Sequence, residues 1–377
     1  MPGYRNLIMS RKAAMVIAAL ATLLYIYHLL LYPTNPVSDL HQSSTSNLTS
    51  PFQNSTRIEG VPSIKLSTSG SAASHCLPLP QYQPLPPDNL HNCSLPYVSM
   101  NNGGRLGNKI CQYMSLALLR SVFGIRVGIL KNMNNYLRKI FPKLSLPVED
   151  PKCFHGTPSR DNFSALYRNL SVRNSASGRN LVDSKLHPYL LSESVYIYNY
   201  PCPWNLLLPL RDQLRQELVF HDAILNKAKM HLNHAVKSLL NNATKNITII
   251  TVHVRRTDYL NYIKVNYKLK PLKKTYFQRA FKFFRNRVAS PVFAVSSDDP
   301  EWCKNNIMDK DVVFVGTKDP VLDMALLSLG DHHVITYGTY GFVSAFLGAG
   351  IIVYPDNKDR PVFPCLNSTI LQSISRN

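Results

Sequence analysis

The sequence predicts an α/β protein with parallel sheets, preceded by one membrane-spanning helix and a flexible stem. Three observations lead to this prediction. Strand and helix patterns alternate over more than 100 residues in the C-terminal part, which is typical of doubly wound parallel sheets. An early segment of 20 residues is apolar and uncharged. The stretch that follows it is rich in Ser, Thr, Asn and Pro.

The early apolar segment predicts a membrane anchor. Residues 13–32 contain no Asp, Glu, Lys or Arg, and a helix of this length spans about 30 Å, one hydrocarbon core. Arg5, Arg11 and Lys12 precede the segment, so we expect residues 1–12 in the cytosol and the following chain in the lumen. A cleaved signal peptide is the alternative, but its apolar region usually has about 7–15 residues. We therefore expect an uncleaved anchor of a single-pass type II protein.

The stretch after the anchor predicts a stem that carries glycans. Ser, Thr, Asn and Pro supply 23 of the 43 residues from 33 to 75, too little apolar surface to fold, and we place the stem at 33–95. Eight Asn-x-Ser/Thr sequons follow the anchor, as a lumenal location predicts. The expected glycosylation sites are Asn47, Asn54, Asn92, Asn162, Asn169, Asn242, Asn246 and Asn367. Asn246 is the weakest of these, because it opens a predicted buried strand.

All seven cysteines also follow the anchor, where disulfides are permitted. No Cys-x-x-Cys pair occurs, so a zinc site is not expected. An odd number of cysteines leaves at least one thiol unpaired. We expect two or three disulfides and one buried thiol rather than a catalytic cysteine, and Cys111 is the candidate thiol because it lies in an apolar helical stretch.

The folded domain, residues 96–377, is strongly basic. It contains 37 basic and 19 acidic residues, a net charge of +18. Such a surface favours anionic ligands or an anionic membrane face, whereas the lumenal location excludes nucleic acid. Most of these basic side chains are still expected to be ordinary solvated residues.

The first part of this domain predicts one βαβ unit and then an irregular region. The expected elements are a strand at 97–101, a Gly-rich turn at 102–108, a helix at 109–123, a strand at 125–130, a strand at 195–200 and one or two amphipathic helices within 206–241.

The second part, about 246–355, has a clearer pattern. The continuous apolar and β-branched run at 247–254 predicts a strand buried on both faces. Asp298 is expected to be the N-cap of the helix predicted at 299–308. The further expected elements are helices at 274–288, 299–308, 320–329 and 339–347 and strands at 292–296, 312–315, 333–337 and 351–354. Ligands of such sheets bind beyond the carboxyl ends of the strands, so functional residues are expected there.

Three segments at predicted strand ends carry polar or glycine residues. The turn at 103–108 (G-G-R-L-G-N) opens a helix and offers backbone N–H groups to an anion. The segment 253–259 (H-V-R-R-T-D-Y) places Arg255 and Arg256 where guanidinium groups can hold phosphate oxygens bidentately. The turn at 338–341 (G-T-Y-G) offers further donors. The alternatives are plain glycine turns and a structural Arg–Asp pair.

A fourth strand end carries two carboxylates. Asp298 and Asp299 can accept hydrogen bonds from a ribose or a guanine edge, and Asp299 is the preferred ligand because Asp298 is the expected cap. Two glycine turns, an arginine pair and a carboxylate pair on one edge suit a nucleotide diphosphate. Together with a lumenal domain on a stem and anchor, they indicate a Golgi transferase that uses a sugar nucleotide.

At these residues the chain resembles the α-1,2-fucosyltransferase family, which is similar in its motifs to the α-1,6- and protein O-fucosyltransferases. The family patterns are G-R-L-G-N-Q, H-x-R-R-x-D-Y and D-x-A-L-L-S followed by G-T-F/Y-G. They stand here at 104–109, 253–259, 323–328 and 338–341. The match runs in order over about residues 97–355, and Lys109 replaces the usual Gln.

The resemblance implies a GT-B-like fold of two Rossmann-like parts, with GDP-fucose as the donor. It also implies transfer to the 2-hydroxyl of a terminal β-galactoside, with inversion at the fucose anomeric carbon. By analogy, Arg255 and Arg256 would stabilise the leaving β-phosphate. The donor-binding residues that it implies are Arg105, Asn108, His253, Asp299, Gly338 and Thr339.

An inverting transfer needs a base for the acceptor hydroxyl, and we expect Asp258 to be that base. Glu193, Asp323 and Asp331 are the alternatives. The segment 309–311 (D-K-D) matches the D-x-D pattern through which other glycosyltransferases hold a metal. It falls at the opposite edge of the predicted sheet, so no metal is expected and arginine carries the charge.

Two other functions stay open. A lumenal sulfotransferase would also bind a phosphorylated nucleotide, but it would need a P-loop-like site, and Arg105 is the one such basic residue in the first turn. A non-catalytic sugar-nucleotide or glycan-binding protein of the same fold would keep the glycine turns and lose the arginines.

Overall fold

The computed structural model describes residues 96–149, 159–176, 191–239, 246–356 and 371–376. All of them belong to one compact unit of the chain. The expected cytosolic tail, anchor and stem lie outside the described residues. Within the described ranges, no helix is both long and apolar enough to cross a membrane.

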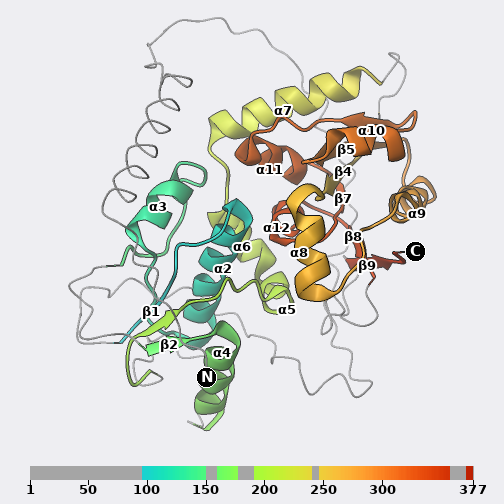
Figure 1. Ribbon diagram of the computed structural model, residues 1–377. Helices are drawn as coiled ribbons and strands as arrows, with labels where there is room; N and C mark the ends of the chain where they lie inside the picture. The colour runs from blue at the N-terminus through green and yellow to red at the C-terminus, as the bar shows by residue number, and fades with distance from the viewer. Residues whose placement is uncertain (1–95, 150–158, 177–190, 240–245, 357–370, 377) are drawn as a thin grey trace, which may run out of the picture. The chain divides into compact units, whose positions relative to one another are not determined.

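The described strands form two parallel sheets (Figure 1). The first has the order β1-β3-β2, with β1 at Val98–Met100, β2 at Ser159–Asp161 and β3 at Val195–Ile197. The second has the order β6-β5-β4-β7-β8-β9, with β4 at Thr248–Val254, β5 at Pro291–Ser297, β6 at Val312–Phe314, β7 at His332–Val334, β8 at Ile352–Pro355 and β9 at Leu371–Ile374. The α/β class with parallel sheets is therefore confirmed.

Helices separate most of these strands (Figure 1). Those of the first part are α2 at Leu106–Phe123, α3 at Lys131–Arg138 and α4 at Phe163–Ala176. Four helical segments follow, namely α5 at Trp204–Leu207, η5 at Leu208–Leu210, α6 at Arg211–Glu217 and α7 at Asp222–Lys237. The second part contains α8 at Thr257–Tyr267, α9 at Lys274–Arg285, α10 at Pro300–Asn306, α11 at Pro320–Ser328 and α12 at Thr339–Leu347.

Strand β4 is buried on both faces, as its continuous apolar sequence predicts. Ile250 and Val252 belong to a buried cluster with the aromatic side chains of α9. Ile249, which points to the other face, belongs to a second cluster with the apolar residues of α11. The Thr251 hydroxyl on that face donates to the Leu327 carbonyl of α11 at 2.7 Å. The larger sheet is therefore covered by helices on both sides.

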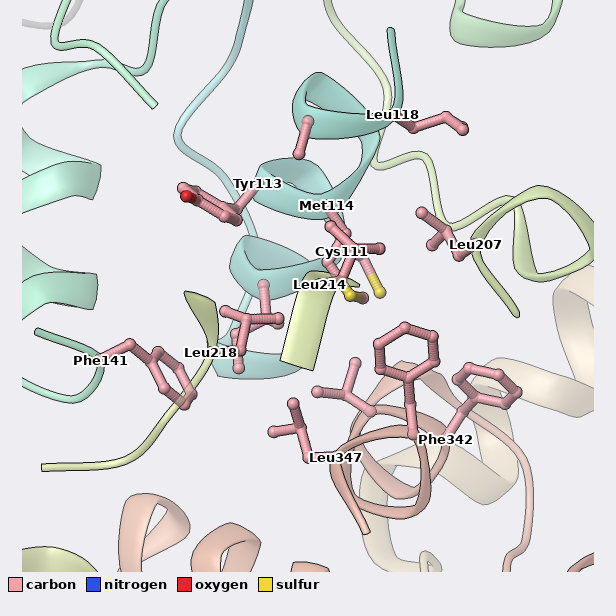
Figure 2. Close-up of a cluster of buried hydrophobic side chains, with 14 of the residues drawn as sticks. Cys111, Tyr113, Met114, Leu118, Phe141, Leu207, Leu214, Leu218, Phe342 and Leu347 are labelled. Carbon is pink, nitrogen blue, oxygen red and sulfur yellow. The ribbon is translucent and has the colours of Figure 1, made fainter. Parts of the chain in front are cut away.

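Helix α2 is buried on nearly all sides and joins the two parts of the domain. Every residue of this helix except Asn108 and Lys109 is buried. Figure 2 shows its side chains among those of the segment containing α5 and α6 and those of α12. The helix ends at Gly124, whose left-handed conformation lets its N–H donate to the Arg120 carbonyl at 2.9 Å.

The expected strand at 125–130 did not form. Val127 and Ile129 make only isolated parallel bridges, to Val98 and Val148. The Gly128 N–H still donates to the Val98 carbonyl at 2.9 Å, but the backbone of Ile129 bonds to Pro147 and Glu149 instead of continuing along β1. Helices α3, α4 and α8 and strands β2 and β9 were not predicted.

The expectation that Cys111 is an unpaired thiol was wrong. Cys111 in the middle of α2 forms a disulfide with Cys202, and the two Cα atoms are 5.1 Å apart. The chain before α5 lies along α2 here, since the Ser115 hydroxyl contacts the Pro201 carbonyl at 3.4 Å. Among the described cysteines the unpaired one is Cys303, which is buried, and burial raises its pKa to about 11. A buried, protonated thiol is inert, so Cys303 is structural.

Candidate active site

Two helix starts from distant parts of the chain meet at the site. The Thr339 hydroxyl at the start of α12 donates to the Asn108 side-chain oxygen in α2 at 2.6 Å. A Cβ on Gly107 would lie 2.9 Å from the backbone of Tyr340, so only glycine allows the two helices to approach this closely. Gly338 precedes α12 with φ at 98°, which also favours glycine. The two predicted glycine turns therefore form one surface.

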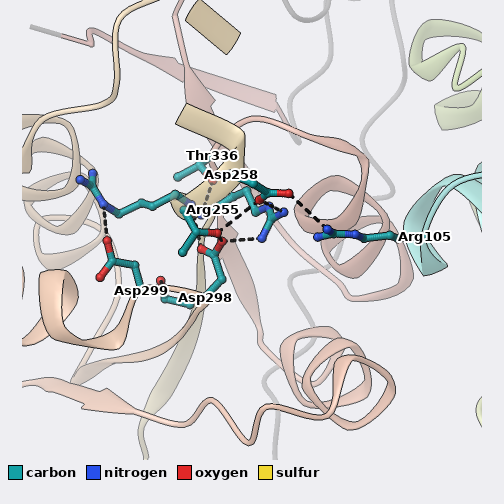
Figure 3. Close-up of polar contacts among 9 residues, drawn as sticks. Arg105, Arg255, Asp258, Asp298, Asp299 and Thr336 are labelled. Carbon is teal, nitrogen blue, oxygen red and sulfur yellow. Dashed lines mark hydrogen bonds and ion pairs between the residues drawn. The ribbon is translucent and has the colours of Figure 1, made fainter. Parts of the chain in front are cut away.

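The arginine pair follows β4 at the carboxyl edge of the larger sheet. Figure 3 shows Arg255 among the aspartates of this edge. The Arg255 backbone N–H donates to the Thr336 hydroxyl at 3.0 Å, which fixes the chain where it leaves the strand. The Arg255 guanidinium pairs with Asp298 through one terminal nitrogen and with Asp258 through the other. Two of its five N–H groups are thus bound to these carboxylates, which leaves three for a ligand.

Arg256 is held in a different way. Its Nε lies 3.1 Å from an oxygen of Asp299, and its guanidinium carbon lies 3.9 Å from the centre of the Trp302 ring. Its backbone N–H donates to Asp298 at 2.8 Å. The ion pair and the stacking contact together fix a planar cation that is only 15% exposed.

The expectation that Asp298 is the N-cap was wrong. Helix α10 begins after Asp299, whose carboxylate accepts from the Trp302 N–H at 3.1 Å. Asp298 instead accepts hydrogen bonds from Arg255, from the Arg256 N–H and from the Thr257 hydroxyl. Asp298, which was expected mainly as a cap, therefore holds the arginine pair instead.

The strand register explains the role of Asp298. Strands β4 and β5 are neighbours, and Val254 is paired with Ser297. The next residue of each strand, Arg255 and Asp298, therefore leaves the sheet at the same height. The available signal was an arginine directly after the predicted strand at 247–254 and an aspartate two residues after the predicted strand at 292–296.

Asp258, the expected base, lies beside the arginine pair. It occupies the first turn of α8, its side chain is 58% exposed, and it lies between Arg255 and Arg105. The Arg105 guanidinium is 3.2 Å from the second Asp258 oxygen. This contact connects the first glycine turn to the arginine segment, and both groups remain open to solvent.

The three alternative bases lie elsewhere. Asp323 is buried and accepts from the Ser296 hydroxyl at 2.9 Å. Asp331 accepts from the Ile249 N–H at 2.8 Å, at the amino edge of the larger sheet. Glu193 is exposed and precedes β3, so it lies at the amino edge of the smaller sheet.

His253 lies beneath the start of α12. Its side chain is buried, its ring centre is 5.1 Å from that of Tyr340, and its Nδ1 faces Gly341. Burial lowers the pKa of His253 to about 4, so the imidazole is neutral at neutral pH. His253 therefore supports the α12 turn by packing and adds no positive charge to the site.

Lys109, which replaces the usual Gln of the resembled family, is turned toward the first glycine turn. Its ammonium donates to the side-chain oxygen of Asn102, and partial burial lowers its pKa. Lys109 thus stabilises the loop that carries Arg105.

The D-x-D segment has an arginine partner. Arg285 lies 2.8 Å from a carboxylate oxygen of Asp309 and 2.5 Å from one of Asp311. The segment precedes β6, at the edge of the sheet opposite the arginine pair. In the described part of the chain, no group of three or more His, Cys, Asp or Glu could hold a metal ion.

Three expected glycosylation sites lie in the described ranges. Asn169 and Asn246 are exposed, and Asn246 lies two residues before β4. The Asn162 side-chain oxygen accepts from the Ala165 N–H at 2.9 Å and so caps α4. The other five sequons fall outside the described residues.

The two parallel sheets and the polar site beyond the strand ends define a doubly wound α/β protein with its site at the carboxyl edge of the larger sheet. Comparison with known proteins then identifies the family. Residues 90–364 match glycosyl transferase family 11, and the chain belongs to this family.

Relatives in this comparison carry fucosyltransferase names. Galactoside 2-alpha-L-fucosyltransferase SEC1 of Bos taurus is 32% identical over 268 residues, which cover 70% of this chain and 67% of that protein. Galactoside alpha-(1,2)-fucosyltransferase 1 of Homo sapiens is 34% identical over 263 residues, which cover 68% of this chain and 67% of that protein. Among solved structures, NodZ alpha-1,6-fucosyltransferase soaked with GDP-fucose overlaps 73% of this chain and 98% of its own at 11% identity, with a TM-score of 0.44.

Proposed function

We propose that this protein is an inverting glycosyltransferase that moves L-fucose from GDP-fucose to the 2-hydroxyl of a terminal β-galactoside. The names of the two relatives support the sugar, the acceptor and the linkage. The structural observation that carries the proposal is the arginine pair beyond β4, held by aspartates beside two helix starts. Ligands of parallel sheets bind at this edge.

The arginines supply charge where the donor bond breaks. Cleavage between fucose and the diphosphate leaves negative charge on the β-phosphate. Arg255 has three N–H groups for this charge, and Asp298 and Asp258 hold its guanidinium plane before the donor arrives. An N–H group that is already oriented toward the phosphate needs no reorganisation as negative charge develops there. The Thr339 hydroxyl and the N–H groups at the α2 and α12 starts would bind the remaining phosphate oxygens.

Asp258 would accept the proton in this mechanism. The acceptor oxygen forms a bond to C1 of fucose from the side opposite the diphosphate, which inverts the configuration. The bond from C1 to the phosphate oxygen breaks at the same time, and the hydroxyl proton moves to Asp258. The exposure of this carboxylate and its place beside Arg255 support the assignment.

The guanosine would bind next to the pair of aspartates. Asp299 uses one oxygen to cap α10 and the other to hold Arg256, and each oxygen keeps a further lone pair. His253 and Gly338 would contribute to donor binding indirectly, because they shape the turn at the start of α12.

The proposal includes the location of the enzyme. The apolar segment 13–32 supports a single-pass type II anchor in the Golgi membrane, with residues 33–95 as the stem and 96–377 as a lumenal, two-part GT-B-like domain. Protease protection in sealed microsomes tests the orientation. Treatment with a glycosidase that removes N-linked glycans tests whether the sequons are used, because it lowers the apparent mass of a glycosylated protein. Neither protease protection nor a loss of mass is expected for a cytosolic protein.

The central test uses the full chain in detergent, with labelled GDP-fucose and a β-galactoside. We expect fucose transfer that survives EDTA, and a loss of at least about 100-fold in kcat in Arg255→Ala. GDP-fucose binding without transfer to any glycan would favour the non-catalytic binder. A protein that does not bind GDP-fucose but uses a phosphosulfate donor as its substrate would be a sulfotransferase. Loss of activity in EDTA would assign a metal role to the D-x-D segment.

A further inference from the structure

Helix α8 exposes a row of large apolar and aromatic side chains. Tyr262 is 44% exposed and Val265 is 55% exposed. Ile263 is the one buried residue of this fully described helix. Monomeric proteins seldom leave such neighbouring side chains open without a ligand or partner for them.

This face begins at the reaction centre. Asp258, Tyr262 and Val265 have the spacing i, i+4 and i+7, so they lie on one side of the helix. The helical rise places Tyr262 about 6 Å and Val265 about 10 Å along the axis from Asp258. A molecule that presents a hydroxyl to Asp258 would therefore extend along this row.

The Tyr262 ring is held in place without being covered. Its centre lies 5.1 Å from that of Tyr259 at an interplanar angle of 31°, and 5.7 Å from that of Tyr267 at 68°. Packing against two other rings limits the rotamers of Tyr262 and leaves part of its surface open. A fixed aromatic surface loses little entropy when it binds a ligand.

A second exposed tyrosine packs against the glycine turn that carries Arg105. Tyr200 is 50% exposed, and its ring lies against Gly103, where a Cβ would come within 2.7 Å of the ring carbon Cζ. Gly103 is two residues before Arg105, which is 3.2 Å from Asp258. The segment that carries Arg105 and the helix that carries Asp258 thus each have an exposed tyrosine nearby.

We propose that the exposed face of α8, centred on Tyr262, binds the acceptor sugar. A pyranose has a flat patch of C–H groups that stacks on an aromatic ring, while its hydroxyls reach polar groups at the edge. Asp258 and Asn261 supply such groups on α8. The inference rests on the proposed function, since it needs a hydroxyl acceptor for the group carried by the donor. It makes Tyr262 a residue that determines acceptor affinity and leaves donor binding to the glycine turns and arginines.

The test compares steady-state kinetics of the full-length chain with those of Tyr262→Ala, Tyr262→Phe and the control Met230→Ala. Met230 is 73% exposed and lies on α7, outside the site. For Tyr262→Ala we expect an acceptor KM raised by about 10-fold, with a GDP-fucose KM within about twofold of the unchanged protein. Tyr262→Phe keeps the ring and should restore the acceptor KM, and Met230→Ala should change neither constant.

The outcomes separate the inference from the proposed function. If the unchanged protein transfers fucose and Tyr262→Ala keeps its acceptor KM, the acceptor binds elsewhere and the inference is overturned while the function stands. A face that instead binds another protein or a membrane surface would give that same result. If the unchanged protein transfers no fucose to any β-galactoside, the proposed function fails, and the inference fails with it. Equal rises in both KM values would also overturn the inference, because they would show a collapsed site rather than a lost stacking contact.

Discussion

Replacing Asp298 by alanine should disable the site with little effect on the fold. Asp298 accepts hydrogen bonds from the Arg255 guanidinium, the Arg256 N–H at 2.8 Å and the Thr257 hydroxyl. It caps no helix, because that role belongs to Asp299. The substitution removes the group that orients the arginine segment and leaves α10 intact.

The size of the effect follows from these contacts. A hydrogen bond to a charged group is worth about 1.5–3 kcal/mol, and Asp298 makes such bonds to both arginines. Its side chain is 23% exposed, so solvent screens part of the interaction. A loss of about 2–3 kcal/mol in transition-state stabilisation corresponds to a fall of about 30- to 150-fold in kcat/KM.

The assay is transfer from GDP-fucose to a β-galactoside, measured as kcat/KM beside a thermal melt of the same preparation. Asp309→Ala is the matched control, because it removes an aspartate from an arginine pair at the opposite edge of the sheet. A kcat/KM for Asp298→Ala within about threefold of the unchanged protein would refute the reasoning. A fall in activity that only tracks a lower melting temperature would refute it as well.

Three further predictions concern stability. Cys202→Ser opens the disulfide to Cys111, whose sequence separation is 91, and should lower the free energy of unfolding by about 4 kcal/mol in denaturant titrations; an unchanged midpoint would contradict this. Burial lowers the pKa of His253 to about 4, so between pH 6.5 and 4 this imidazole binds a proton in the unfolded chain and stays neutral in the folded chain. The stability contributed by His253 should therefore fall by about 1.4 kcal/mol per pH unit from 6.5 towards 4, so His253→Asn should melt with a shallower pH dependence. Gly341→Ala places a methyl group 3.0 Å from the His253 ring carbon Cγ and should cost about 1–3 kcal/mol, seen as a lower melting temperature.

The arginine site could be predicted because its parts follow strands of one parallel sheet. A continuous apolar run identified β4, and the residue order then placed Arg255 and Arg256 beyond its carboxyl end. The start of α12 at Thr339 was predicted at the same residue, since Gly338 interrupts the chain before an apolar helix. Local sequence carries this information, because each strand and turn has its own pattern.

Other features depend on contacts that local sequence does not encode. Asp298 and Asp299 are adjacent and chemically identical, and only the direction of the chain after β5 decides which one caps α10. Helix α8 was missed because its apolar and aromatic residues are not confined to one buried side, and Ile263 is the one residue of this helix that is buried. The pairing of Cys111 required knowing which segment lies along α2.

The contact between α2 and α12 has a consequence for engineering. Gly107 lies against the Tyr340 backbone and Asn108 binds Thr339, while Arg211 of α6 donates to the Phe346 carbonyl at 2.8 Å near the other end of α12. A chimera that combines the first part of one relative with the second part of another would have to match these contacts at both ends of α12. Altered donor preference would accordingly require both turns to be exchanged together.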